Sequence, residues 1–328
     1  MNIPRRHLLP LGVGAAQIVG RELEALATVE RGGHALGAKI RLKVRHADKE
    51  LAGRAIDGAL VEIDKVGSLM SLYRQDSQIS RLNRDGELAN PHPWLAKVLK
   101  AAQRISRQSD GDFDITVQPL WKLYAEAKKA GRIPRKVEIE AARGKVGWQR
   151  VEMKENHIRL RGEGTAITLN ALAQGFAADI AAATLKKHGI QHALVDTGEF
   201  AAMGRSAKGL PWKVGVQHPR EEDAFVAVAS LDGRCLSTTG DYATKFSDDF
   251  AYNHIFQPST GKSPEELASV SVCAPSAMQA DALSTTFAVT GVKRGMEMLS
   301  NLPGGDALFV LKSARLLATK NFPMENLT

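Results

Sequence analysis

The stretch SVSVCAPSAMQADALSTTFAVTG, residues 269–291, contains a strand end, a turn and a helix in immediate succession. Residues 271–274 are typical of the end of a strand, and Pro275 stops it. Ser276 and Gln279, three residues apart, form the capping-box pattern that begins a helix. The stretch therefore predicts a helix over 276–290 that starts directly after a strand.

Two polar residues on this helix can converge on one point. Asp281 and Thr285 are four positions apart and share one face, whereas Leu283 and Phe287 mark the face that packs against the core. A carboxylate and a hydroxyl are oxygen ligands that Mg²⁺ accepts, with water or phosphate oxygens completing its shell. The alternative is that the pair lies on solvated helix surface, as most Asp/Thr pairs at this spacing do.

Two polar segments upstream favour a common site. The loop YNHIFQPSTG, residues 252–261, carries His254 ahead of a turn-forming run. The segment LSTTGDY, residues 236–242, is a strand end that enters a hydroxyl-rich bend, where a glycine lets backbone N–H groups approach an anion. Each segment lies next to a predicted strand, so we expect one site assembled from strand ends.

Six short blocks occur in order along the chain. They are SLY with DS and RLN (71–73, 76–77, 81–83), GDFDITVQPL (111–120), AQGFAAD (173–179), TGDY (239–242), HI (254–255) and DALST (281–285). Together they resemble the ApbE family of FAD:protein FMN transferases, over roughly residues 34–322. The variants ALGA (35–38), LNALAQG (169–175) and DTGE (196–199) most resemble the NosX branch, which is associated with nitrous oxide reduction.

The resemblance implies a metal and substrate site. It implies that Asp281, Thr285 and the backbone carbonyl of Ala171 bind Mg²⁺. The residues that it implies for FAD binding are Leu36, Tyr73, Asp112, Phe113, Asp114, Thr168, Gln174 and Ile255. The aromatic face of Tyr73 suits an isoalloxazine ring, and the turn before the helix predicted at 174–188 aims a helix N-terminus at an anion. For Asp112 and Asp114 the alternative is local backbone capping.

Two positions depart from the family pattern. Thr168 stands where an acid is common, and Gln174 stands where a lysine is common. The two lost charges are opposite, so the local charge balance stays similar.

His254 is the candidate for activating an acceptor hydroxyl, because an unperturbed imidazole titrates near pH ~6.5. The alternative is that His254 is a polar loop residue. Asp241 is a second candidate base, or else a residue that shapes its loop.

The implied activity is cleavage of the FAD pyrophosphate, transfer of FMN to a Ser or Thr hydroxyl of an acceptor flavoprotein and release of AMP, with Mg²⁺ neutralising the phosphates. A hydrolase alternative lets water attack FAD at the same site, giving FMN and AMP. A second alternative, a non-catalytic flavin-binding assembly factor, is consistent with the departures at Thr168 and Gln174. The NosX-like variants imply an acceptor with an exported flavin domain in the nitrous oxide pathway.

Composition sets the broad class. The 328 residues are 44% hydrophobic and 24% charged, which is typical of a soluble globular protein with a large core. The net charge of +8 suits anionic ligands such as dinucleotides, whereas 5% aromatic residues and no dense Lys/Arg block argue against nucleic-acid binding. Cys235 and Cys273 form no C-x-x-C pair, which disfavours a cysteine zinc site. They are either two small buried residues or, in an oxidising compartment, a disulfide.

Residues 1–27 predict an export signal. Arg5-Arg6 begins it, a mildly apolar stretch covers 8–20, and Ala25-Leu26-Ala27 resembles a cleavage site. A disordered N-terminus is the alternative. We expect a periplasmic protein exported by the twin-arginine route. No other segment has the ~18 uninterrupted apolar residues of a membrane span, so we expect no stable membrane insertion.

The remaining pattern alternates irregularly between helices and strands. Helices are predicted at 52–70, 95–105, 122–144, 174–188, 276–290 and 292–299. Strands are predicted at 34–45, 150–153, 157–160, 166–169, 192–196, 212–216, 225–231, 233–237, 307–311 and 316–319. The G-x-G-x-x-G fingerprint is missing, so the expected fold is α+β with mixed sheets flanked by helices, ApbE-like and not a Rossmann fold. Residues 28–328 are expected to form one domain, or one domain with two lobes.

Overall fold

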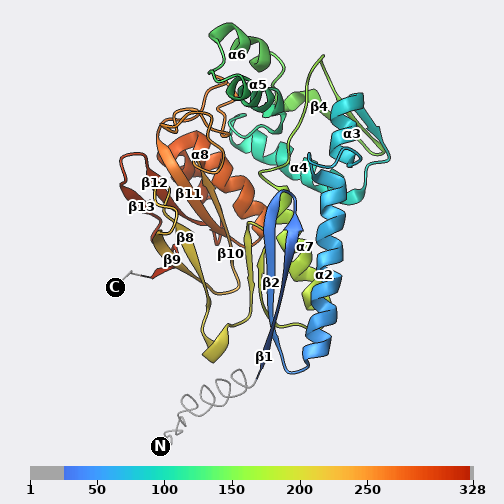
Figure 1. Cartoon of the computed structure of the whole chain (residues 1–328), viewed down its shortest axis with the longest axis vertical. Coiled ribbons are helices and arrows are strands. Elements are labelled where there is room, and N and C mark those ends of the chain that lie inside the picture. Colours follow the sequence, from blue (N-terminus) through green and yellow to red (C-terminus); the bar gives the residue numbers. More distant parts are fainter. Residues whose placement is uncertain (1–25, 326–328) are drawn as a thin grey trace, which may run out of the picture.

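A computed structural model describes residues 26–325 of the chain (Figure 1). An eight-stranded sheet forms the centre of the molecule, and all of its neighbouring strands pair antiparallel. In spatial order its strands are β1 (Ala27–Ala35), β2 (Ala38–His46), β6 (His192–Asp196), β7 (Phe200–Met203), β10 (Cys235–Gly240), β11 (Leu267–Ala274), β12 (Asp306–Leu311) and β13 (Leu316–Ala318).

Two three-stranded sheets and seven α-helices complete the described fold. The small sheets are β14 (Met324–Glu325), β9 (Phe225–Leu231) and β8 (Trp212–Gln217), and β3 (Glu87–Ala89), β5 (His157–Leu160) and β4 (Val151–Lys154). The helices are α2 (Lys49–Met70), α3 (Gln78–Asp85), α4 (Pro93–Gln108), α5 (Gln118–Lys129), α6 (Lys136–Arg143), α7 (Ala173–Lys187) and α8 (Ala277–Ser300). This confirms an α+β fold that is not a Rossmann fold.

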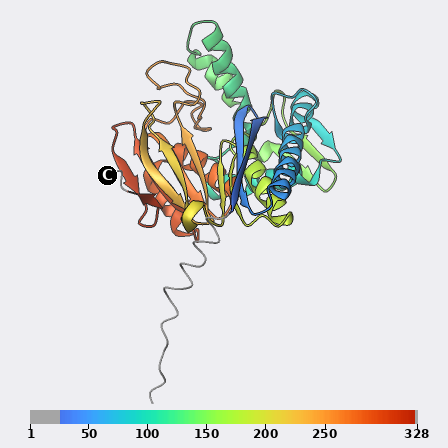
Figure 2. The ribbon, with the colours of Figure 1, turned by 60° about the horizontal axis from the view of Figure 1, so that its bottom comes forward.

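The central sheet is covered differently on its two faces (Figure 2). Helices α2, α7 and α8 bury one face, with Val195 of β6 and Val272 of β11 pointing toward them. The β8–β9–β14 sheet covers the other face, where Leu194 and Leu236 pack. Because side chains alternate along each strand, one sheet supplies the inner layer of both cores.

The strand register decides the state of the two cysteines. Cys235 lies opposite Ala274, and Cys273 lies opposite Leu236. Directly paired residues share a face, so the two cysteines, one position out of register, point to opposite faces. Accordingly Cys235 packs with the helices and Cys273 with the small sheet, and both are free thiols. The disulfide alternative is wrong, and the prediction of two small buried residues is confirmed.

Helices α7 and α8 meet at a close junction. A β-carbon on Gly175 would overlap the carbonyl oxygen of Ala277, so only glycine allows this approach. Asp179 accepts hydrogen bonds from the backbone N–H groups of Ala277 and Met278, at 2.7 and 3.0 Å. Asp179 of α7 therefore caps the N-terminus of α8 and holds the start of α8 against α7.

Gly291 divides α8 into two helical parts. Its φ of 79° and ψ of 179° are not helical. The Val292 N–H, which begins the second part, donates to the Glu266 carboxylate at 3.2 Å. The sequence prediction of one helix to 290 and another from 292 is confirmed. The helix start at Ser276 is confirmed as well, since the Ser276 hydroxyl accepts from the Gln279 N–H at 3.3 Å, although the described hydrogen bonds do not include the return bond from the Gln279 side chain that would complete the capping box.

Three strand predictions differ from the structure. Residues 34–45 form most of a hairpin, β1 and β2, which turns at Leu36 and Gly37 with φ of 53° and 81°. The prediction misses most of β1, whose side chains are largely exposed, and all of β3, β7 and β14. Residues 166–169 are not a strand. Both backbone groups of Ile167 are bound by the side chain of Asn83, at 2.7 and 2.8 Å.

Helices α5 and α6 project from one end of the molecule (Figures 1 and 2). Their apolar faces form a separate cluster around Tyr124, Phe246 and Phe256. The Tyr124 hydroxyl donates to the Gly261 carbonyl at 3.1 Å. This pair of helices confirms the helical excursion predicted at 122–144 and braces the loop that carries His254.

Two predictions concern the N-terminus and membranes. Residues 1–25 of the predicted export signal lie outside the described residues, and β1 begins at Ala27. Within residues 26–325 no helix combines the length and apolarity that crossing a bilayer requires.

Candidate active site

A cavity of about 220 Å³ brings together most of the predicted site residues. Its walls are the 112–117 loop, the 168–174 turn, the end of β10, the 252–256 loop and the first half of α8. The predicted residues that line it are Asp112, Phe113, Asp114, Thr168, Ala171, Gln174, His254, Ile255, Asp281 and Thr285. Segments separated by more than 150 positions thus converge, as expected for a site assembled from strand and helix ends.

The 168–174 turn is held in place by its neighbours. Besides the Asn83 clamp on Ile167, the Thr168 N–H donates to the Ile115 carbonyl at 2.8 Å. The Thr168 hydroxyl accepts from the Asn170 N–H at 3.2 Å. These bonds set the turn beside the 112–117 loop, and Ala171 follows at the cavity wall.

Asp281 is the most deeply placed acid of the cavity. It is 3% exposed, and its Oδ2 accepts from the Gly175 N–H at 3.0 Å. Burial raises its pKa to about 8, the Gly175 N–H partly opposes this, and the Asp179 carboxylate adds to it. An acid with this pKa lacks a cationic partner in the protein.

Thr285 lies one turn after Asp281 and faces the same cavity. Its hydroxyl is 3.1 Å from the hydroxyl of Thr239, which in turn is 2.7 Å from that of Ser284. The hydroxyl-rich bend of β10 and the polar face of α8 therefore meet, as the sequence predicts. The core face of α8 is also confirmed, because Leu283 and Phe287 are buried in the cluster between α8 and the sheet.

Glu199 is a cavity residue to which the sequence analysis assigns no role. It lies between β6 and β7, is 7% exposed, and has an Oε2 without a hydrogen-bond partner. Burial raises its pKa well above the usual range, and the nearby Asp281 carboxylate raises it further. The DTGE variant contains it, but nothing local to that motif shows that Glu199 faces α8.

The two acids of the 112–117 loop differ. Asp114 accepts from the N–H and hydroxyl of Thr116, at 2.7 and 2.6 Å, and from the Trp148 N–H at 2.8 Å. Its carboxylate caps the local backbone, which is the alternative that the sequence left open. Asp112 makes no such network within the described hydrogen bonds, and burial raises its pKa. Asp112 is thus the acid of this loop that is free to contact a ligand.

His254 lines the cavity from the 252–256 loop. Its Nδ1 is buried without a hydrogen-bond partner. Burial lowers the pKa of the imidazole, and the Thr244 backbone and the Asp241 carboxylate partly oppose this. The ring is therefore neutral at pH 7, the form in which it can accept a proton.

Three predicted residues lie outside the cavity wall. Asp241 is 1% exposed and is bound by the Arg220 guanidinium through two contacts of 2.7 and 2.9 Å. The two contacts favour the alternative that Asp241 shapes its loop over the alternative that it acts as a base. Tyr73 is 73% exposed and lies over Gly37, beside Leu36 at the β1–β2 turn. Leu36 is half-buried and packs against the main core.

The titratable side chains of the described cavity wall are acids and His254. Four carboxylates line it, those of Asp112, Asp114, Glu199 and Asp281, and the described lining residues contain no lysine or arginine. The chain's excess of positive charge is thus located elsewhere. A diphosphate would meet only acids here unless a cation came with it.

The donor set fits Mg²⁺ better than a transition metal. No group of three or more His, Cys, Asp or Glu side chains able to hold a metal occurs within residues 26–325. A cation in the cavity would therefore combine one or two carboxylates with hydroxyl, carbonyl, water or phosphate oxygens. Such an oxygen shell is the one that Mg²⁺ accepts.

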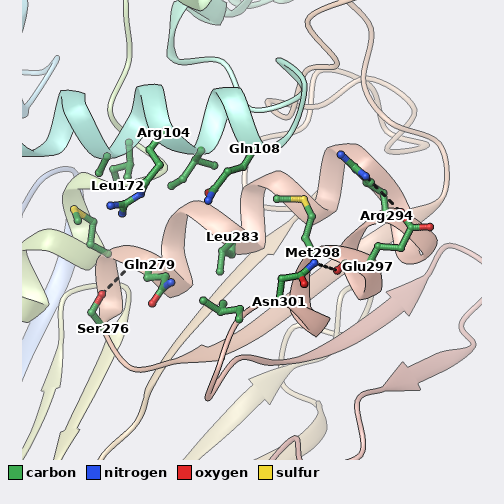
Figure 3. Close-up of a pocket in the computed structure, with 14 residues that line it drawn as sticks. Arg104, Gln108, Leu172, Ser276, Gln279, Leu283, Arg294, Glu297, Met298 and Asn301 are labelled. Carbon is green, nitrogen blue, oxygen red and sulfur yellow. Dashed lines mark hydrogen bonds and ion pairs between the residues drawn. The ribbon is translucent and has the colours of Figure 1, made fainter.

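A larger groove of about 570 Å³ runs between α4 and α8 (Figure 3). Arg104 and Gln108 reach it from α4, and Arg294 reaches it from the second part of α8. Arg294 is bound by Asp110 and Glu297, at 2.9 and 3.5 Å. None of the predicted site residues lines this groove, so its size alone does not make it the active site.

Comparisons with known proteins identify the family of the chain. Residues 36–309 match the ApbE family. The chain is 31% identical to the FAD:protein FMN transferase of Salmonella typhimurium over 282 residues, 81% of this chain and 80% of that protein. Its fold matches the ApbE protein of Thermotoga maritima with a TM-score of 0.81 and 26% identity, covering 91% of this chain and all of that one. The Pseudomonas stutzeri flavinyl transferase ApbE matches with a TM-score of 0.74 and 28% identity, over 90% and 94% of the two chains. The chain therefore belongs to the ApbE family.

Proposed function

We propose that this chain is an FAD:protein FMN transferase. It binds FAD in the cavity beneath Asp281 and transfers the FMN half to a Ser or Thr hydroxyl of an acceptor flavoprotein, releasing AMP. Family membership supports the reaction class, and the curated relative from Salmonella typhimurium carries this activity in its name. The cavity supports the placement, because it holds both a candidate base and a candidate cation site.

The acidic cavity wall carries the proposal that the reaction depends on Mg²⁺. Four acidic side chains and no lysine or arginine line the described wall, so the diphosphate of FAD needs a cation between it and the protein. Asp281, the Thr285 hydroxyl and the Ala171 carbonyl would hold Mg²⁺. When bound, Mg²⁺ would neutralise phosphate charge and stabilise the charge that develops on the leaving AMP.

His254 is proposed as the general base. The acceptor oxygen forms a bond to the phosphorus that carries riboflavin, the pyrophosphate P–O bond breaks, and AMP leaves with the bridging oxygen. The acceptor's proton passes to the imidazole, which is neutral at pH 7 because burial lowers its pKa. Phe113 and Ile255, buried on the cavity wall, supply apolar contact for the flavin half.

One incubation tests the reaction and separates it from the alternatives. FAD, Mg²⁺ and a candidate acceptor domain are mixed with the protein, and products are separated after denaturation. Flavin fluorescence on the acceptor band together with free AMP supports the transferase. Free FMN and AMP with an unlabelled acceptor would indicate an FAD pyrophosphatase. Intact FAD would indicate a flavin-binding assembly factor.

The acceptor and the location follow as parts of the same proposal. We infer an acceptor flavoprotein with an exported flavin domain, of the nitrous oxide reduction pathway, and a periplasmic site of action. The DTGE and LNALAQG variants and the twin-arginine start support these inferences. Mass spectrometry of the N-terminus of the protein purified from periplasm tests the location, since export with cleavage predicts a chain that begins near residue 28.

A further inference from the structure

Glu199 is the buried acid of the cavity for which the proposed reaction has no use. Its backbone is fixed: the Glu199 carbonyl accepts from the Thr197 N–H at 3.0 Å, and the Thr197 hydroxyl donates to the Gln174 carbonyl at 2.8 Å. The β6–β7 turn is thereby tied to the first turn of α7. This anchoring holds the Glu199 side chain at the cavity wall rather than in solvent.

The environment of Glu199 lacks a cation. The Ser237 side chain and the Thr238 backbone favour its ionised form, but its Oε2 has no partner. The charged groups that act on it are Asp281 and Asp196, both acids. A buried carboxylate with a free oxygen costs free energy, and a second carboxylate beside it increases that cost. A divalent cation between the two acids removes both penalties at once.

We propose that Glu199 is, with Asp281, a second carboxylate ligand of the divalent cation, and that it allows the protein to bind this cation before FAD arrives. The proposal rests on the proposed function for the identity of the site, and adds to it a ligand and an order of binding. When both Glu199 and Asp281 bind the cation, their carboxylates balance its two positive charges. With Asp281 alone, half of that balance would have to come from the FAD diphosphate.

The same charge gives Glu199 a second effect. Without a cation, no side chain of the described cavity wall carries the positive charge that the diphosphate needs. FAD binding should therefore depend strongly on the metal. Removing the Glu199 charge should weaken cation binding and, at the same time, make FAD binding less dependent on the cation.

Titration of the protein with Mn²⁺ alone, followed by loss of the free-ion EPR signal, tests the proposal without turnover. Wild-type protein should bind one Mn²⁺ in the absence of FAD, and Mg²⁺ should compete. Glu199→Gln should weaken this binding at least about tenfold, the lower end of the cost of losing even an outer partner of a metal ligand. Glu152→Gln is the matched control, because Glu152 is an acid of β4 that does not line the cavity, and the Mn²⁺ affinity of this variant should be unchanged.

Two results distinguish failure of this inference from failure of the proposed site. If Asp281→Asn loses Mn²⁺ binding while Glu199→Gln retains wild-type affinity, the cation site stands and Glu199 is not a ligand. If neither substitution changes the affinity, the cation lies elsewhere and the proposed site falls as well. Wild-type protein that binds Mn²⁺ only with FAD would overturn the order of binding.

A second measurement covers the case in which Glu199→Gln does not fold. Glu199→Asp keeps the charge but shortens the side chain by one methylene, and it should also weaken Mn²⁺ binding. FAD affinity is then compared in EDTA and in Mg²⁺ by flavin fluorescence. The ratio of the FAD affinity in Mg²⁺ to that in EDTA should be larger for the wild type than for Glu199→Gln. If Glu199→Gln does not fold, Glu199→Ala takes its place in this comparison. Equal ratios would contradict a role for the Glu199 charge.

Discussion

The two cavities beside α8 differ in size, in charge and in how well their polar groups are satisfied. The groove between α4 and α8 is the larger, and Arg294, one of its two arginines, is already bound by Asp110 and Glu297 (Figure 3). The smaller cavity buries Glu199 Oε2 and His254 Nδ1 without partners. Unsatisfied buried groups are costly, so they mark the place where a ligand completes the structure. Volume alone would point to the groove and not to the proposed active site.

The largest effect should come from Asp281. Asp281→Ala is expected to lower the rate of flavin transfer by about 100-fold or more, since a metal ion contributes several kcal/mol of transition-state stabilisation. Arg104→Ala, on the groove side, is the control and should keep the wild-type rate. Rates are measured as flavin fluorescence gained by the acceptor. If Asp281→Ala and Arg104→Ala lost the same share of the transfer rate, the result would contradict the assignment of the reaction to the smaller cavity.

His254 should have the next largest effect. His254→Ala should lower the rate by about 100-fold, at the low end of what a general base contributes. Because burial lowers the pKa of His254, the wild-type rate should not fall until the pH drops below about 6.5, the value of an unperturbed histidine. The variant should lose this acidic limb of the pH–rate profile. A limb that persists in the variant would assign the base to another residue.

A smaller effect, on stability, should come from the α7–α8 junction that positions Asp281. Gly175→Ala introduces a β-carbon into the space of the Ala277 carbonyl, so we expect a loss of roughly 1–3 kcal/mol in unfolding free energy, as for other overpacked sites. Gly58→Ala in α2 is the matched control. Its new β-carbon would meet only side-chain atoms at 3.4 Å or more, and alanine favours a helix. Urea denaturation of both variants measures the difference.

The smallest effect is expected in the groove. Arg294→Ala removes two ion pairs whose members are all at least two-fifths exposed, so stability should change by less than about 1 kcal/mol. Flavin transfer should remain at the wild-type rate. A loss of transfer that exceeds the loss of stability would show that the groove contributes to the reaction.

Sequence patterns predict those features that depend on neighbours along the chain. The Ser276 cap, the shared face of Asp281 and Thr285, and the break at Gly291 each need only a few adjacent residues. The resemblance of the six sequence blocks to the ApbE family also predicts that the 112–117 loop and the 168–174 turn belong to the site. Both segments line the cavity. The catalytic and metal-binding roles of these residues stay predictions.

Features that depend on contacts between distant segments could not be predicted. Glu199 becomes a cavity residue only because the β6–β7 turn is bound to α7, and the sequence contains no local sign of that contact. Residues 166–169 look like a strand, but the Asn83 side chain takes the hydrogen bonds that a neighbouring strand would supply. Asp112 and Asp114 look alike in sequence, but only Asp114 accepts hydrogen bonds from Thr116 and Trp148.

The placement of Cys235 and Cys273 on opposite faces of the sheet bears on how this protein matures. The chain has only these two cysteines, and their register keeps them from joining. Folding therefore requires neither an oxidant nor an isomerase, and the finished structure tolerates reductants. Its two thiols therefore do not make folding depend on the redox state of the compartment.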